Sequence, residues 1–146
     1  MVQGTEYNSN FPASNVLIDG GHCSAMQWFA EQGKTTGQGF TVRVDNCTRL
    51  IDGCQIKNND CVRVYKKATK KFRLMGSSLN ENGPWEILLE YELPNRLGSY
   101  RPPLVDLYFE EPVEIQFLKF ELVSYWGSEG GGLKYFAPLL APSKAS

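Results

Sequence analysis

Residues with catalytic chemistry are few in this sequence. The one histidine, His22, lies in a glycine-flanked stretch beside Cys23 and Ser24. A catalytic triad depends on geometry in space, so three neighbours in sequence do not form one. General acid–base catalysis also needs positioned partners, and the carboxylate pair Glu110 and Glu111 is typical of solvated charges at a strand end. The sequence therefore predicts a protein that is not an enzyme.

Cysteines are the second group with chemistry of their own. There are four, Cys23, Cys47, Cys54 and Cys61, and no two have the C-x-x-C spacing of a structural zinc site. An even number predicts at least one disulfide, and the three possible pairings stay open. A glycosylation sequon begins at Asn46. Together these features favour an extracellular protein.

Basic side chains gather between positions 63 and 73. Two interpretations stay open for this run. The lysines protect an exposed strand from edge-to-edge pairing, or they bind an anionic partner such as a sulfated glycan or a phospholipid headgroup. The residues in the proposed patch are Lys66, Lys67, Lys70 and Lys71.

The overall charge and hydropathy exclude two broad classes of partner. The net charge is −1, so no global field attracts nucleic acid. No apolar run approaches the ~20 residues of a membrane-spanning helix. We therefore expect neither nucleic-acid binding nor a membrane span.

Apolar residues alternate with polar ones through most of the chain, which is the period of a half-buried strand. Positions 40–44, 105–109 and 118–122 show this pattern, and no segment sustains a period of 3.6. From Trp85 to Leu93 the apolar residues share one parity against glutamates, which predicts a strand with one wet face. Seven or eight such strands indicate an all-β sandwich.

One strand organises the closing part of the chain. Its apolar phase slips between Phe117 and Leu118, so we expect a bulge or a bend there. Phe120, in mid-strand, is predicted to be buried, as are Trp28 and Trp85. The strand leads to a turn at positions 130–132, where three glycines permit positive φ angles and close chain approach.

The length of 146 residues fits one domain. We expect a loose N-terminal arm over residues 1–10, a β-sandwich domain over 11–141 and a frayed tail over 142–146.

Several motifs occur together in a recognisable order. The chain contains P-A-S-N-V-L-I-D-G from position 12, F-T-V-R-V-D from 40, F-R-L-M-G-S from 72 and F-E-L-V-S-Y-W-G from 120, followed by G-G-G-L from 130. In this order the motifs resemble the discoidin family, also called coagulation-factor C-type domains. The resemblance runs from about Phe11 to Leu140, nearly the whole chain, and it implies a jelly-roll β-sandwich of the galactose-binding-like fold.

The resemblance also raises the question of calcium. Many relatives hold the ion with an aspartate in the opening D-G loop, backbone carbonyls and a late glutamate. Asp19 matches that aspartate. Tyr135 stands near the position of the glutamate and carries no carboxylate, although hard cations need several oxygen ligands. Calcium is therefore left open.

Family members bind sugars, anionic lipid headgroups or other proteins through loops at one end of the sandwich. We expect a non-catalytic glycan-binding module that acts in adhesion or as a lectin, at the cell surface or outside the cell, within a larger protein. The alternatives are a protein-interaction module without a sugar site and a module for anionic phospholipid headgroups. Planar polar groups and an aromatic face suit a sugar. The candidate residues are His22, Asn58, Arg96, Tyr100, Arg101 and Trp126.

Overall fold

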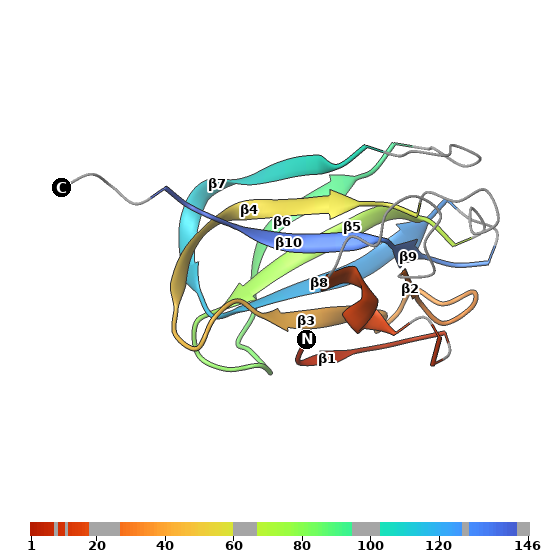
Figure 1. The fold of residues 1–146 in the computed structure, drawn as a ribbon, viewed down its shortest axis with the longest axis horizontal. Helices are drawn as coiled ribbons and strands as arrows, with labels where there is room; N and C mark the ends of the chain where they lie inside the picture. Colours follow the sequence, from red (N-terminus) through yellow and green to blue (C-terminus); the bar gives the residue numbers. More distant parts are fainter. Residues whose placement is uncertain are drawn as a thin grey trace.

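The computed structural model describes residues 1–7, 9–10, 12–17, 27–59, 67–94, 103–126 and 129–142. These residues form two antiparallel sheets that pack into a sandwich (Figure 1). One sheet has the strand order β1-β3-β8-β5-β6 and the other has the order β10-β4-β7, while β2 and β9 form a short ladder. The all-β jelly-roll prediction is confirmed. Among the described residues, no helix has the length and apolar character needed to cross a membrane.

Seven of the strands have five residues or more, and β1, β2 and β9 have two residues each. The elements are β1 (Gln3–Gly4), the 3-10 helix η1 (Ala13–Leu17), β2 (Trp28–Phe29), β3 (Gly39–Arg43), β4 (Arg49–Lys57), β5 (Thr69–Ser77), β6 (Glu86–Glu92), β7 (Val105–Ile115), β8 (Phe117–Tyr125), β9 (Gly132–Leu133) and β10 (Tyr135–Leu140).

An aromatic cluster fills the space between the sheets. Phe120 of β8 has no exposed surface, and its ring stacks on those of Phe40 and Phe72, with centroids 5.0 Å apart in both pairs. Trp28 meets the same ring edge to face, with the two centroids 5.7 Å apart. Phe136 brings β10 of the other sheet to within 5.3 Å of Phe40. The predicted burial of Phe120 and Trp28 is confirmed, and these rings hold the two sheets together.

The chain changes sheet between β7 and β8. Ile115 is the last residue of β7, which pairs with β4, and Phe117 is the first residue of β8, which pairs with β3. The bend therefore falls at Gln116, one residue before the predicted position. Phe117 and Leu118 are both buried, because the apolar phase is reset where the strand enters the second sheet.

The prediction for β6 is confirmed in part, because the strand exists and Leu89 and Leu93 contact the core. Ile87 is 58% exposed and Tyr91 is 36% exposed, although both were expected to face the core. Leu88 has no partner on β5, so a bulge reverses the parity of the strand at that point. Trp85, predicted to be buried, is half-buried. An edge strand with one neighbour buries little of either face, which alternation alone does not reveal.

The N-terminal arm is not loose throughout. Gln3 and Gly4 form β1, and they pair with Thr41 and Phe40 of β3. A Cβ on Gly4 would lie 2.5 Å from the Cβ of Ala13, so only glycine lets η1 pack this close. This part of the predicted arm is wrong. The other domain boundaries stay predictions, and residues 143–146 of the predicted tail lie outside the described residues.

The two described cysteines are free thiols. Cys47 is exposed in the connection between β3 and β4, whereas Cys54 is buried in β4. Every pairing of all four cysteines would place Cys47 and Cys54 in disulfides. Because both are free thiols, none of the three complete pairings is formed. Cys23 and Cys61 lie outside the described residues, and a bridge between them stays a prediction.

Candidate functional site

The strands on the right of Figure 1 end close together. The backbone N–H of Trp126, after β8, donates to the carbonyl of Ala68, just before β5, at 2.9 Å. Leu93, after β6, donates to the carbonyl of Lys70 at 2.7 Å. The glycine turn joins the same end, because Ala30 donates to the carbonyl of Gly131 at 3.0 Å. We call this region, where β4, β6 and β8 end and β5 and β9 begin, the loop end.

Asn58 is part of the framework of the loop end. Its side-chain amide donates to the carbonyl of Thr69 at 2.9 Å and accepts from the N–H of Thr69 at 3.1 Å. The hydroxyl of Thr69 then donates to the carbonyl of Gly132 at 2.7 Å. Asn58 is buried, so its prediction as a ligand-binding residue is wrong. A buried amide that satisfies two backbone groups ties the end of β4 to the start of β5.

Lys67 is also a structural residue. Only 4% of it is exposed, and its ammonium donates to the carbonyl of Glu129 at 3.3 Å and lies 4.1 Å from the ring centroid of Tyr7. Its own carbonyl accepts from the side chain of Asn59. Burial lowers the pKa of Lys67, and the charge of Glu129 offsets only part of that effect. A cation held in this way is not available to an anionic ligand, so Lys67 does not belong to the predicted patch.

The remaining described lysines of the proposed patch have internal partners too. The ammonium of Lys70 lies 4.6 Å from the ring centroid of Trp126, and that of Lys71 lies 3.7 Å from a carboxylate oxygen of Glu90. Lys66 lies outside the described residues. Each described lysine of the run thus has a partner within the protein, and these contacts add no support for an anionic partner.

The glycine turn closes over this framework because it has no side chains. A Cβ on Gly131 would lie 2.5 Å from a methyl of Leu122. One on Gly132 would lie 2.5 Å from the amide nitrogen of Asn59 and 2.7 Å from the carbonyl of Trp28. Of the three glycines, Gly130 alone has a positive φ angle, 142°. Of the two reasons for glycine predicted from the sequence, close approach of the turn to its neighbours therefore matters more than positive φ angles.

Trp126 is the described candidate residue that remains suited to a ligand. It is half-buried, and its indole N–H donates to the carbonyl of Leu93 at 2.8 Å. The polar edge of the ring thus points into the protein, and Lys70 lies over the ring. This anchoring fixes the orientation of an aromatic side chain that keeps exposed surface, which is the requirement for a stacking platform.

The other candidate residues, His22, Arg96, Tyr100 and Arg101, lie outside the described residues. Leu93, which is bonded to Trp126, precedes the segment with Arg96 by a few positions in the chain. That these four residues share a surface with Trp126 therefore stays a prediction. Sequence reasoning missed the framework role of Thr69, Asn59 and Lys67. The available signal was the run of amides Asn58-Asn59 directly after a strand, since buried polar groups at strand ends need partners.

A shallow hollow of about 270 Å³ lies beside the loop end, over the outer face of β3 and β8. Its charged residues are already engaged, because Glu121 is paired with Arg73 at 3.0 Å and the ammonium of Lys119 lies 5.5 Å from the ring centroid of Trp85. The only aromatic residue in its lining is Phe40, which is buried in the core. The hollow therefore offers a sugar no exposed stacking face.

The described residues do not fit a calcium ion. They contain no group of three or more His, Cys, Asp or Glu side chains placed to hold a metal. Tyr135 is half-buried where the resemblance expects a glutamate, and the preceding residue, Lys134, is completely buried. A tyrosine supplies no carboxylate oxygen for a divalent cation. Asp19 lies outside the described residues.

The chain matches no protein-family model and no curated protein, but it resembles solved structures. One is the family 32 carbohydrate-binding module of C. perfringens NanJ in complex with galactose, with a TM-score of 0.71 and 14% identity over 94% of this chain and 91% of that one. Another is chitosan-binding module 2 of a chitosanase/glucanase from Paenibacillus sp. IK-5 in complex with chitotriose, with a TM-score of 0.67 and 12% identity over 92% and 91%.

A third similar structure holds the CBM32-1 and CBM32-2 domains of C. perfringens ZmpB in complex with GalNAc. The TM-score is 0.70 and the identity 20%, over 96% of this chain and 33% of that one. The chain thus spans about a third of that two-module structure. At these identities the similarity shows the fold, and it confirms a galactose-binding-like β-sandwich. Membership of the discoidin family itself stays a prediction.

Proposed function

We propose that this chain is a non-catalytic module that binds glycans. The observation that supports this most is the similarity over more than 90% of the chain to modules solved with galactose, GalNAc and chitotriose. A shared fold does not by itself transfer a function, so the proposal needs a site on this chain. We assign that site to the loop end, and the anchored, half-buried Trp126 among converging strand ends supports the assignment.

In the proposed site, Trp126 is the stacking platform for one sugar face. Carbon-bound hydrogens of a pyranose pack on an indole, while the hydroxyl groups need planar donors and acceptors. We assign those polar contacts to His22, Arg96, Tyr100 and Arg101. Asn58 is excluded from this role because its amide is already bonded to Thr69. We place the module outside the cell or at its surface, within a larger protein.

Galactose, GalNAc and chitotriose are the probes for a test by isothermal titration calorimetry. A small neutral sugar at a shallow site is expected to bind with Kd on the order of 0.1–1 mM, which is about −4 to −5.5 kcal/mol. Arg101→Ala removes a hydrogen-bonding group worth about 1–3 kcal/mol and should nearly abolish binding. The sequence predicts a loop around Arg101, and an exposed loop residue contributes little to folding, so we expect the melting temperature to stay within about 2 °C.

Arg43→Ala is the matched control, because Arg43 is an exposed arginine at the far end of β3, where it lies over the ring of Phe117. It should leave sugar affinity unchanged. The proposed site is rejected if Arg43→Ala and Arg101→Ala weaken binding equally. The proposed function is rejected if none of the three sugars binds the wild-type protein.

A further inference from the structure

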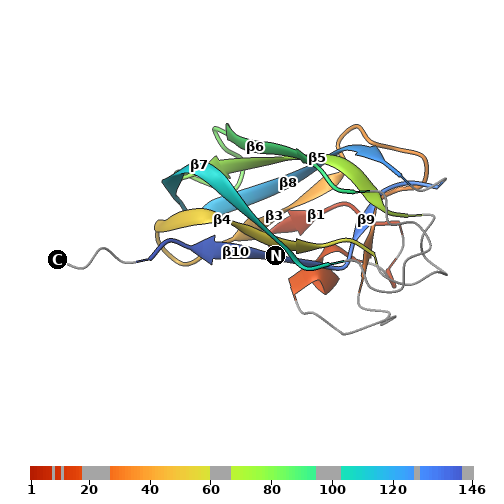
Figure 2. The same ribbon diagram turned by 90° about the horizontal axis from the view of Figure 1, so that it is seen from above.

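One side of the sandwich is closed and the other is open. The 3-10 helix η1 packs against β10 and β1, which are the edge strands on one side. On the other side β6 and β7 are the edge strands, and each pairs with a single neighbour in the described part of the chain. Figures 1 and 2 show β6 and β7 next to each other, with η1 away from them below β10. Two rows of backbone groups are therefore left unpaired on the same side.

A groove runs between these two edges. It consists of two adjoining hollows of about 390 Å³ and 350 Å³, which share Glu86 and Val113 in their linings. The buried residues Phe109 and Ile115 contribute to its lining, so the core is accessible from this side. Phe109 and the three residues after it have no partner on β4, because the register jumps from Tyr108 to Val113. This bulge makes β7 an irregular edge strand.

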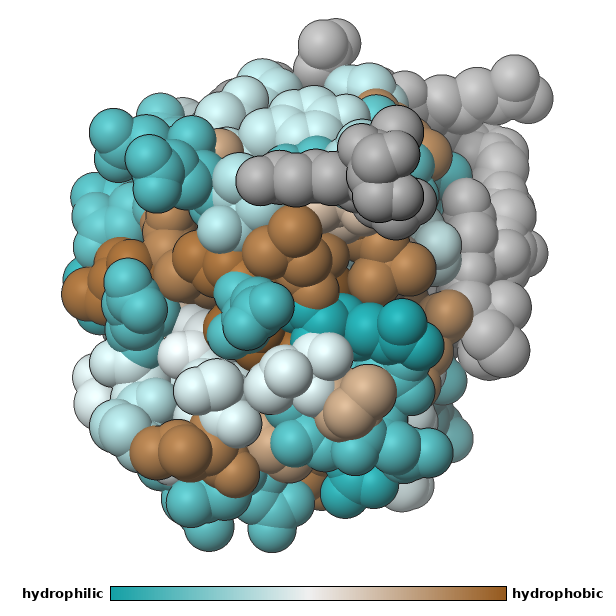
Figure 3. Space-filling model, turned by 90° about the vertical axis from the view of Figure 1, so that its left-hand side faces the viewer, coloured by the Kyte–Doolittle hydropathy of each residue, from teal (hydrophilic) through white to brown (hydrophobic). Residues whose placement is uncertain are grey.

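Large apolar side chains are exposed along the groove. Leu79, in the lining of the first hollow, is 69% exposed, and Ile87, in that of the second, is 58% exposed. Leu88 and Val113 are half-buried between them. Figure 3 views the molecule from the left-hand side of Figure 1, and apolar side chains are exposed among hydrophilic ones on that side. Large apolar side chains exposed next to charged ones are typical of an interaction site.

The charges around the groove have one sign. Glu86, Glu110, Glu111 and Glu114 are exposed, and none has an ion-pair partner among the described residues. Glu90, farther along β6, differs in that Arg73 neutralises it at 2.7 Å. The groove thus combines uncompensated glutamates with a few exposed apolar side chains such as Ile87, which favours a partner that carries both basic and apolar side chains.

We infer that the groove is a docking site for an extended, basic peptide segment that adds as a strand alongside β6. Its backbone pairs with the free edge, its apolar side chains enter the hollows at Ile87 and Val113, and its lysines or arginines meet the glutamates of β7. Successive side chains of a strand point to opposite faces, so a peptide that alternates apolar and basic residues can present both kinds at once. An amino-sugar polymer shares the charge, but it cannot pair with a row of amides and carbonyls.

The test uses a labelled peptide as long as β6, seven residues, that alternates Lys with Val. Fluorescence anisotropy measures its binding to the whole chain, with a Glu-Val peptide of the same pattern as the matched control. The Lys-Val peptide should bind and the Glu-Val peptide should not. Reversing two charges with Glu110→Lys and Glu111→Lys should weaken binding by about tenfold or more. Ile87→Lys, which removes the apolar contact, should act in the same direction.

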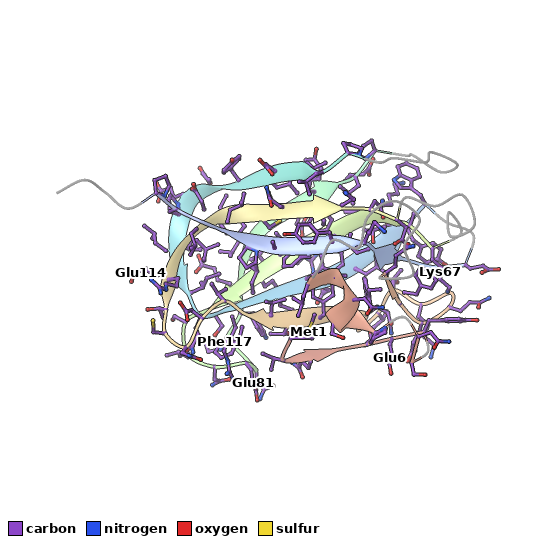
Figure 4. All side chains as sticks on the ribbon, viewed as in Figure 1. Met1, Glu6, Lys67, Glu81, Glu114 and Phe117 are labelled. Atoms are coloured by element: carbon purple, nitrogen blue, oxygen red, sulfur yellow. The ribbon has the colours of Figure 1, made fainter. Side chains whose placement is uncertain are left out.

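Glu6→Lys is the control variant, because Glu6 is an exposed glutamate at the other end of the molecule from Glu114 (Figure 4). It should leave affinity unchanged. Hydrogen exchange adds a readout of strand addition, since the β6 amides should exchange about tenfold more slowly with the peptide bound. The inference is overturned by equal binding of both peptides, by an equal effect of Glu6→Lys, or by chitotriose displacing the peptide. None of these outcomes depends on sugar binding at the loop end.

Discussion

The indole N–H of Trp126 donates a hydrogen bond to the backbone carbonyl of Leu93, with the two atoms 2.8 Å apart. Leu93 is buried, so the carbonyl has little access to water. The contact joins the end of β8 to the end of β6, and it orients the ring that we assign to sugar stacking. A hydrogen bond of this kind contributes to folding and to the preorganisation of the site at once.

Trp126→Phe should separate these two contributions. Phenylalanine keeps an aromatic face but has no N–H, so the free energy of unfolding should fall by about 1 kcal/mol. Sugar affinity should weaken moderately, whereas Trp126→Ala should abolish it. Urea unfolding and calorimetry measure the two effects. Trp85→Phe is the control, because Trp85 is a half-buried tryptophan for which the described residues provide no hydrogen-bond partner. An equal loss of stability in both variants would contradict the role of the hydrogen bond.

Phe120→Ala should be among the most damaging changes to the core. The ring is completely buried and stacked between Phe40 and Phe72, so its removal leaves a cavity that rigid neighbours cannot fill. The expected loss is about 3–5 kcal/mol of unfolding free energy, measured by urea denaturation. Tyr108→Ala is the comparison, since Tyr108 is 59% exposed and should cost about 0.5 kcal/mol or less. Similar losses would show that Phe120 is not central to the core.

The sequence predicted those parts of the fold where one face of a strand is wet and the other dry. β7 and β8 have largely that arrangement, and their alternation of apolar and polar residues follows directly from it. β3 was predicted from the same alternation, although four of its five residues are buried. β6 lacks that arrangement, because as an edge strand with a bulge it exposes apolar residues such as Ile87. Leu89 and Leu93 still contact the core, and a single sequence cannot show at which residue the strand changes parity.

The framework of the loop end could not be predicted because its bonds connect distant positions. Lys67 contacts Tyr7 and Glu129, which are separated from it by tens of residues in either direction. From the sequence, Lys67 was one of several lysines in a basic run, and nothing distinguished the buried one. Asn58 was similar, since an amide in a turn suits a ligand as well as it suits the backbone of Thr69. Trp126 was identified because its motif places it directly after a strand.

The two described cysteines should differ in reactivity in the native protein. Burial, with a further contribution from Asp106, raises the pKa of Cys54 to about 12, so its reactive thiolate is absent near neutral pH. Cys47 is exposed and should react with Ellman's reagent at once. Mass spectrometry of the labelled native protein should find Cys47 modified and Cys54 unmodified, and denaturant should make both reactive. Rapid labelling of Cys54 in the folded state would contradict its placement in β4.

Calcium should not stabilise the chain. A ligand that binds only the folded state at about 100 times its Kd adds about 2.7 kcal/mol to the free energy of unfolding. Because Tyr135 stands where the resemblance places a carboxylate, we expect no rise in melting temperature when calcium replaces EDTA. Magnesium at the same concentration controls for general salt effects. A rise specific to calcium would show that oxygen ligands beyond the described residues complete a site.

Stability in mild acid should depend on the ion-pair ladder across the five-stranded sheet. The hydrogen bond and charge of Arg73 hold the pKa of Glu90 below its ordinary value of 4.5, with Lys71 as a smaller cause. A carboxyl whose pKa is lowered by folding stabilises the protein fully above its unfolded pKa. That contribution disappears as the pH falls through the folded pKa.

Glu90→Gln should therefore be less stable than the wild type above pH 4.5, and the difference should shrink below that value. The effect should be small and salt-sensitive, because Glu90 is exposed and solvent screens the pair. Urea unfolding at a series of pH values measures it. Glu92→Gln is the control, since Glu92 is an exposed glutamate of the same strand without an ion-pair partner in the described structure. A difference between Glu90→Gln and wild type that stayed constant across the series would mean that the pair with Arg73 contributes nothing.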